Sequence, residues 1–287
     1  MKLETRNLKL AILAILLPMT LTAFAQQPLT APQAITDPTK LQSKTVADMQ
    51  TFSIEKLYMT RTIGDSTWSP DGKQIAFISN ISGRNNLWLV PATGGWPTQL
   101  TISDQRQSQP VWSPDGTWIA FISDHDGDEQ WDVFLVSPKT GDVVNVTISP
   151  ETAEEEPAWS PDGRQIAYIT KPKTGPSFEI ELMDVATRHV RHLTRNTPKE
   201  LSNTRPIFSR DGKFLVYTQS HASGKDSNIF VLDLASGQST NLTQHEGEHT
   251  YEAHDISPDG KTVLLTSDAQ NGYDNVGLLD IATKKID

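Results

Sequence analysis

Apolar and polar positions along this chain form short segments that recur at a regular interval. Each unit contains two apolar segments of three or four residues, a length typical of strands and too short for helices. The first segments lie at residues 75–78, 119–122, 166–169, 215–217 and 263–265. The second segments lie at residues 87–90, 133–136, 180–183, 229–232 and 276–279. The pattern predicts an all-β chain made of repeated hairpins.

A five-residue phrase precedes the first apolar segment of every unit. One bulky residue is followed by Ser-Pro-Asp-Gly, or once by Ser-Arg-Asp-Gly. Asp in such a phrase bonds to nearby backbone and Gly accepts a positive φ, so the phrase predicts a hairpin turn. It begins at Trp68, Trp112, Trp159, Phe208 and Ile256, in steps of 44, 47, 49 and 48 residues.

A period in the forties with several strands per unit is typical of β-propeller blades. We therefore expect a β-propeller of four-stranded antiparallel blades, with five repeats. The aromatic residues of the phrase, Trp68, Trp112, Trp159 and Phe208, are expected to fill the space between neighbouring blades.

The fifth unit stops before its outer strand. Residues 281–287 align with residues 234–240, after which the preceding unit continues its outer strand through residues 241–243. The last blade is therefore expected to be incomplete, or closed by a strand from residues 54–60, because open sheet edges favour aggregation. The first alternative makes the chain a fragment, and the second makes a closed ring.

The first 25 residues have the pattern of a bacterial signal peptide. Lys2, Arg6 and Lys9 precede an apolar run at residues 10–17, and Ala-Phe-Ala ends at Ala25. We expect cleavage after Ala25 and export to the periplasm. No other stretch approaches the roughly 20 apolar residues of a membrane span. Residues 26–50, rich in Pro, Gln and Thr, predict a linker, which assigns residues 51–287 to the propeller.

Composition excludes several classes of function. The 287 residues are 36% hydrophobic and 21% charged, which is typical of a folded domain. A net charge of −10 argues against a nucleic-acid partner. Because the chain has no cysteine, it has no disulfide, thiolate metal ligand or cysteine nucleophile.

At the five repeated phrases the chain resembles TolB-like propeller repeats, which are WD-repeat-like. The stretch Ile-Glu-Lys-Leu-Tyr-Met-Thr-Arg-Thr-Ile-Gly at residues 54–64 resembles the propeller entrance of the prolyl oligopeptidase family, including dipeptidyl aminopeptidase and acylaminoacyl peptidase-like proteins. That resemblance implies a propeller that admits peptides to an α/β-hydrolase domain with a Ser-Asp-His triad. No Gly-x-Ser-x-Gly nucleophile motif occurs here, so we expect no catalytic residue and no hydrolysis by this chain alone.

Three functions follow as alternatives. The first is an exported, non-catalytic part of a prolyl oligopeptidase-like serine peptidase that gates and docks substrate, working with a separate or lost hydrolase domain. The second is a free-standing TolB-like periplasmic propeller that binds a peptide or protein. The third is a metal-dependent propeller enzyme, although we expect no cofactor.

Candidate ligand residues are expected in the loops, with the run of three glutamates in the loop that enters the third unit and Arg205 before the fourth inner strand. Glu154, Glu155 and Glu156 resemble the propeller glutamates with which dipeptidyl aminopeptidases hold a free amino terminus, since carboxylates anchor an ammonium by charge-assisted hydrogen bonds. Arg205 is a candidate carboxylate ligand, and His254 is a further candidate for the partner-binding face.

One loop carries the candidate metal ligands. His245, His249 and His254 are spaced irregularly among glutamates, and some polysaccharide-lyase propellers resemble this in placing loop histidines around a metal. The spacing matches no defined metal motif. A solvated loop is the favoured interpretation.

Overall fold

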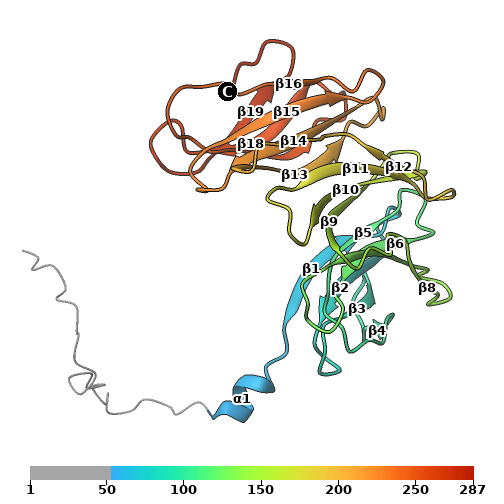
Figure 1. The fold of residues 1–287 in the computed structure, drawn as a ribbon. Coiled ribbons are helices and arrows are strands. Elements are labelled where there is room, and N and C mark those ends of the chain that lie inside the picture. Colours follow the sequence, from blue (N-terminus) through green and yellow to red (C-terminus); the bar gives the residue numbers. More distant parts are fainter. Residues whose placement is uncertain (1–52) are drawn as a thin grey trace, which may run out of the picture. The chain divides into compact units, whose positions relative to one another are not determined.

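The computed structural model describes residues 53–287, within a chain that divides into two units, Met1–Ile54 and Glu55–Asp287. The signal peptide and linker predicted for residues 1–50 lie outside the described residues. The second unit consists of antiparallel sheets whose strands follow one another in chain order (Figure 1). We call these sheets blades 1 to 5.

Each blade is a meander, with consecutive strands paired side by side. The strands of blades 1 and 2 are β1 (Ile63–Trp68), β2 (Gln74–Ser79), β3 (Asn86–Pro91), β4 (Thr98–Gln99), β5 (Gln107–Trp112), β6 (Ile119–Ser123), β7 (Asp132–Val136) and β8 (Val143–Asn145). Those of blade 3 are β9 (Thr152–Trp159), β10 (Gln165–Pro172), β11 (Glu179–Asp184) and β12 (Val190–His192). Those of blades 4 and 5 are β13 (Leu201–Phe208), β14 (Phe214–His221), β15 (Ser227–Asp233), β16 (Ser239–Asn241), β17 (Tyr251–Ile256), β18 (Thr262–Ser267) and β19 (Asn275–Asp280). The prediction of four-stranded antiparallel blades is confirmed for blades 1 to 4.

Blade 5 has three strands, and its fourth is represented by a single bridge between Leu279 and Ile286. The expectation of an incomplete last blade is therefore confirmed. The alternative, closure by a strand from residues 54–60, is wrong because Ile54–Tyr58 forms the short helix α1. Glu, Lys and Leu in this segment favour helix, and the Met59 N–H donates to the Glu55 carbonyl at 2.9 Å.

The repeated phrase forms the turn between the first two strands of each blade. In blade 1 the Ser69 hydroxyl donates to Asp71 at 2.8 Å, and its oxygen accepts the backbone N–H of Gln74. Gly72 has a φ of 69° and its N–H donates to the Ser69 carbonyl. A positive φ is strained for other residues, which explains why Gly ends the phrase in all five blades. The equivalent glycines, Gly116, Gly163, Gly212 and Gly260, have φ values of 70°, 70°, 69° and 72°.

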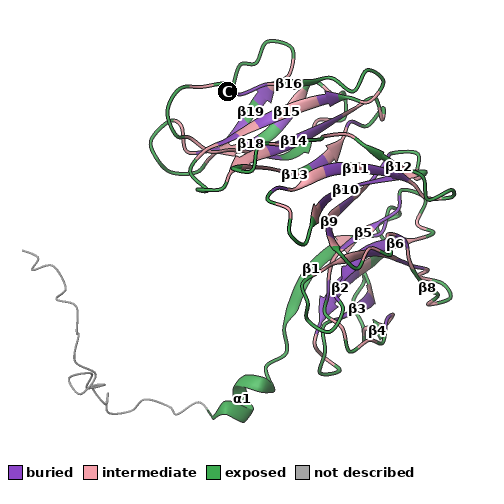
Figure 2. Cartoon of the chain, viewed as in Figure 1, coloured by how far each residue is buried: buried purple, intermediate pink, exposed green. Residues whose placement is uncertain are grey.

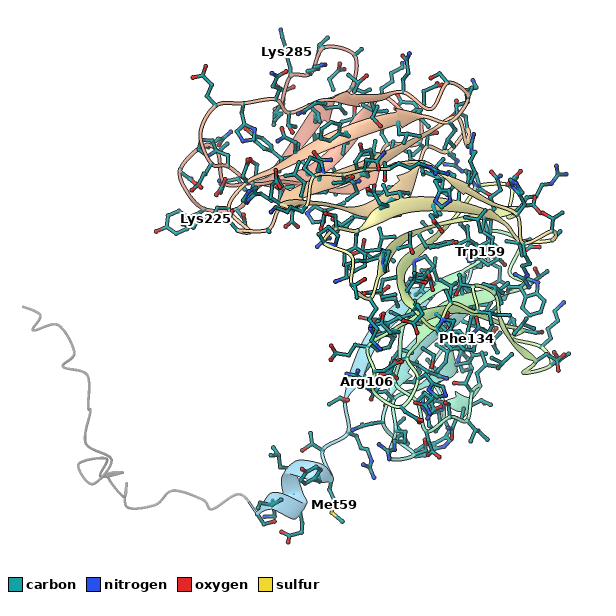
Figure 3. All side chains as sticks on the ribbon, in the orientation of Figure 1. Met59, Arg106, Phe134, Trp159, Lys225 and Lys285 are labelled. Atoms are coloured by element: carbon teal, nitrogen blue, oxygen red, sulfur yellow. The ribbon has the colours of Figure 1, made fainter. Side chains whose placement is uncertain are left out.

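Four apolar clusters join successive blades. Each cluster combines residues from β2 and β3, or their equivalents, with residues from the next blade. Trp112 and Trp159 are only 7% and 8% exposed, and the Trp159 indole (Figure 3) donates to the Val111 carbonyl of blade 2 at 3.1 Å. Phe208 is partly buried in the cluster between blades 3 and 4. The prediction that these three aromatics pack between blades is confirmed.

Trp68 departs from that prediction. Its side chain is 59% exposed, and β1 is almost entirely exposed where the equivalent strands β5 and β9 are largely covered (Figure 2). Among the described strands, none of blade 1 contacts a strand of blade 5. Trp68 is exposed because, among the described strands, none packs against this side of blade 1, whereas the same side of blades 2 to 5 packs against the preceding blade.

This difference makes a matched pair of substitutions informative. Trp159→Ala should lower the free energy of unfolding by about 3–5 kcal/mol, because it opens a cavity between two blades. Trp68→Ala should lower it by about 1 kcal/mol or less, since most of that side chain is already in water. Urea denaturation followed by tryptophan fluorescence measures both. Equal losses would contradict the described packing.

Candidate functional site

The first strands of successive blades contact one another, so their side chains can act together. Each of these inner strands carries a β-bulge, at which the pairing with the second strand shifts register. At the bulge, Gln109, Glu156 and Arg205 have positive φ values of 52°, 54° and 55°. A bulge re-aims the side chain that it carries. In this protein the bulge directs a polar side chain from one inner strand toward the neighbouring inner strand.

Residues at or near the bulges bond in series from blade to blade. Asp65 accepts the N–H of Gln109 at 2.9 Å, and Gln109 accepts the N–H of Glu156 at 2.6 Å. Glu156 in turn accepts the N–H of Arg205, whose guanidinium lies 3.3 Å from the Glu252 carboxylate. We call Asp65, Gln109, Glu156, Arg205 and Glu252 the inner-strand relay. It links all five blades through polar contacts separate from the apolar clusters.

The relay places opposite charges side by side on neighbouring strands. Burial raises the pKa of Glu156, while the N–H and positive charge of Arg205 act in the opposite direction. The Arg205 and Glu252 side chains are 46% and 42% exposed. The pair can therefore meet a ligand from solution, with a guanidinium for a carboxylate and a carboxylate for an ammonium.

Glu154 occupies a different environment from Glu156. Its side chain is buried and accepts hydrogen bonds from the hydroxyls of Ser149 and Thr152. Gln107 in blade 2 and Asn203 in blade 4 hold the same position, five residues before the aromatic, and bond to Thr101 and Thr194, which follow the outer strand of the preceding blade. Thr147 holds the equivalent place after β8 and its hydroxyl acts on Glu154. This equivalence assigns Glu154 to the attachment of blade 3 to blade 2. Burial raises its pKa to about 7.

A cavity of about 440 Å³ borders Glu154. Tyr168, Glu181 and His192 also line it, and they are bonded to one another: the Tyr168 hydroxyl donates to Glu181 at 3.0 Å and His192 lies 2.7 Å from Glu181. Tyr168, Glu181 and His192 are thus engaged with one another within blade 3.

Glu155 lies between these two environments. Burial raises its pKa first of all, the charge of Glu156 raises it further, and Lys171 lowers it. Of the three consecutive glutamates, Glu156 is the one that bonds to Arg205, whereas Glu154 bonds elsewhere. All three lie in β9 and not in the loop that was expected to hold them.

The structure brings together two of the three candidate histidines, His245 and His249, whose ring centroids are 5.7 Å apart. Each faces its own carboxylate: His245 lies 3.1 Å from Asp226, and His249 lies 3.6 Å from Asp268. His254 lies on β17, where its ring bonds to the Thr266 hydroxyl at 2.8 Å. Within residues 53–287, no group of three or more His, Cys, Asp or Glu side chains is arranged to hold a metal ion.

Sequence reasoning missed Asp65 and Gln109, and it considered Glu252 only as one of the glutamates beside the candidate metal-binding histidines. A usable signal exists in the repeat: Asp65, Gln109, Glu156 and Arg205 all stand three residues before the aromatic of their blade. Pro follows Gln109, Glu156 and Arg205 directly. Aligning the blades on the aromatic would have placed these side chains at one position of adjacent strands.

Comparison with known proteins agrees with the repeat. The family model described as the TolB beta propeller domain matches residues 40–221 and 157–285. A search of curated proteins finds no match. In the described part of the chain, no helix combines the length and apolar character needed to cross a bilayer.

Solved structures share the fold. TolB from Acinetobacter baumannii matches with a TM-score of 0.56 and 22% identity over 80% of this chain and 52% of its own. A putative TolB from Agrobacterium tumefaciens matches with a TM-score of 0.55 and 24% identity over 69% of this chain and 72% of its own. A puromycin-hydrolyzing peptidase from Mycobacterium tuberculosis matches with a TM-score of 0.63 and 16% identity over 79% of this chain and 37% of its own. The chain thus spans about half of the Acinetobacter protein and just over a third of the peptidase.

The environment of Glu154 predicts a pH effect on stability. Its pKa is about 7 when folded, against an ordinary value of 4.5, so the folded state binds more protons between these pH values. Stability contributed by this site therefore falls as pH rises from about 4.5 to 7, by up to about 3 kcal/mol. Glu154→Gln, which copies the Gln107 arrangement, should remove this loss.

Urea denaturation at pH 5 and pH 8 measures the effect. The gain of the Glu154→Gln variant over the wild type should be larger at pH 8 by about 2–3 kcal/mol. Glu151→Gln, at an exposed position just before β9, is the control and should show the same stability difference at both pH values. A pH-independent difference for Glu154→Gln would show that Glu154 is ionised in the folded chain at both.

Proposed function

The chain belongs to the TolB beta propeller domain family, and we propose that it is an exported, non-catalytic propeller that docks peptides for a prolyl oligopeptidase-like serine peptidase. In this role its inner strands hold the substrate and gate its access to a hydrolase domain. The observation that carries the proposal is the Arg205–Glu252 pair beside Glu156 in the inner-strand relay. These half-exposed charges of both signs suit the two ends and polar backbone of a short peptide.

Two further facts support a docking role without catalysis. A prolyl endopeptidase structure shares this fold. It matches with a TM-score of 0.64 over 78% of this chain and 35% of its own. The sequence has no Gly-x-Ser-x-Gly motif from which a hydrolase nucleophile could be formed. Peptide cleavage then requires residues outside this propeller.

Export is part of the proposal. The charged start, the apolar run at residues 10–17 and the Ala-Phe-Ala before Gln26 support cleavage after Ala25 and delivery to the periplasm. The N-terminal sequence of the protein purified from the periplasmic fraction would begin at Gln26.

A free-standing TolB-like binding propeller is the second candidate, favoured by the two TolB structures that share the fold. The coding sequence after the Asp287 codon distinguishes the candidates. A Gly-x-Ser-x-Gly domain in the same frame, or one frameshift away, is expected for the peptidase part. An unrelated gene there would favour the free-standing propeller.

Peptide binding tests the docking site directly. The probe is a fluorescein-labelled hexapeptide, Ala-Pro-Ala-Phe-Ala-Lys, prepared with a free and with an acetylated amino terminus. Because Glu156 and Glu252 would hold the ammonium, the free form should bind about tenfold more tightly, which corresponds to about 1.4 kcal/mol. Fluorescence anisotropy measures both dissociation constants.

Variants locate the binding. Glu156→Gln keeps an acceptor for the Arg205 N–H but removes the charge, and it should abolish the preference for the free amino terminus. The matched control is Glu151→Gln at an exposed position outside the relay. Equal affinity for the two peptides, or an unchanged preference in Glu156→Gln, would sink the proposal, as would cleavage of the peptide by this chain alone.

A further inference from the structure

In blades 1, 2 and 4, an aromatic residue of the second strand pairs directly with an aromatic residue of the third strand. The pairs are Phe77 and Trp88 in blade 1, Phe121 and Phe134 in blade 2, and Tyr217 and Phe230 in blade 4. The rings are stacked in blades 2 and 4, with centroids 5.6 Å and 5.3 Å apart. These blades show what the repeat places at this position by default.

Blade 3 departs from this arrangement at two adjacent positions. Tyr168 is paired with Glu181 instead of an aromatic residue. On the outer strand, His192 is paired with Glu181 at the position where blades 2 and 4 have Asn145 and Asn241. Glu181 and His192 lie 2.7 Å apart. A carboxylate and an imidazole thus replace a ring and an amide, and they do so together.

The cavity of about 440 Å³ lies at these two positions. Tyr168, Glu181 and His192 line it from blade 3 together with Glu154, and residues 145–149 line it from blade 2. Its volume falls within the range of small-molecule pockets, about 300–1,000 Å³. The cavity is therefore large enough for a ligand at the place where the other blades stack a ring.

Negative charge is concentrated around the Tyr168 hydroxyl. Burial raises the pKa of Tyr168, and the charges of Glu181 and Glu154 raise it further, so both carboxyl groups lie near this hydroxyl. Asp132 adds a third negative charge, which acts on Glu154. Arg188 also lines the cavity. Within residues 53–287, however, no lysine or arginine forms an ion pair with Glu154 or Glu181.

The carboxyl groups are covered as well as close to each other. The Glu181 side chain is 14% exposed and Glu154 is 3% exposed. A buried carboxylate without a cation is costly, so a ligand that supplies a positive charge is favoured here. Tyr168 and His192 each bond one oxygen of Glu181. A carboxylate has about four acceptor sites, which leaves room for further N–H donors.

We propose that this cavity binds a small aliphatic amine, whose ammonium group lies between Glu154 and Glu181 beside the Tyr168 hydroxyl. An ammonium has three donors, which suits two carboxylates and a hydroxyl oxygen. Val146, Met183 and Val190 line the same cavity and can contact the aliphatic part of the ligand. The site is separate from the Arg205–Glu252 pair of the proposed docking function.

Isothermal titration calorimetry of the full chain tests the proposal at pH 8, above the pKa of about 7 of Glu154. The probe is n-butylammonium chloride. 1-Butanol is the neutral probe of the same length, and sodium chloride is the salt control. The ammonium probe should bind at least about tenfold more tightly than 1-butanol, because only the cation pairs with the carboxylates.

The repeat supplies the variants. Glu181→Phe copies Phe134 and Phe230, so it removes a carboxylate and fills the cavity. It should weaken butylammonium binding at least about tenfold, and its urea midpoint should not fall below that of the wild type. Glu181→Gln removes the charge alone and should weaken binding to a similar extent. Glu151→Gln, at an exposed position outside the cavity, is the matched control and should bind like the wild type.

Glu181→Gln decides the matter if Glu181→Phe does not fold. Equal affinity for butylammonium and 1-butanol would overturn the proposal, as would undiminished binding by Glu181→Gln. A loss of the same size in Glu151→Gln would also overturn it, because attraction to the net negative charge of the chain would then explain the binding.

Discussion

The apolar contact between one blade and the next is the interaction on which the rest of this structure depends. A blade on its own would leave both of its faces in water, because a single sheet of three or four short strands has no second layer to pack against. The following blade is what buries the side chains of Leu87, Val133, Ile180 and Ile229, which are 0% exposed. Stability is therefore a property of neighbouring pairs, as in other repeat proteins.

Polar contacts between blades add what apolar packing lacks, which is a defined position for each inner strand. The relay connects backbone N–H groups at the bulges to side chains of the preceding blade, from Asp65 to Arg205. Because N–H groups at a bulge have lost their strand partner, a side-chain acceptor replaces a ladder hydrogen bond. The same groups that fix the blades also place charge on the inner strands, so scaffold and candidate site share their residues.

The repeated phrase made most of the fold predictable. Its turn chemistry is local, and the five turns, the four complete blades and the packing of Trp112, Trp159 and Phe208 follow from it. Trp68 has the same local sequence, yet it is exposed because burial depends on a neighbour that the phrase does not encode. The segment Ile54–Tyr58 was misassigned because a closing strand was inferred from the needs of blade 5, whereas its own residues favour helix.

The candidate site was predictable only in part, for a related reason. Glu154, Glu155 and Glu156 stand out as a run of like charges, but side chains in a strand are sorted by face and by bulge, so adjacency in sequence separates them in function. Glu156 acts with Arg205, 49 positions later, and Glu154 corresponds to Gln107 and Asn203. In a propeller the residues that act together come from equivalent positions of successive blades. The informative comparison is therefore between repeats. It separates Glu154, whose buried equivalents only join the blades, from Glu156, which lies beside the half-exposed pair Arg205 and Glu252.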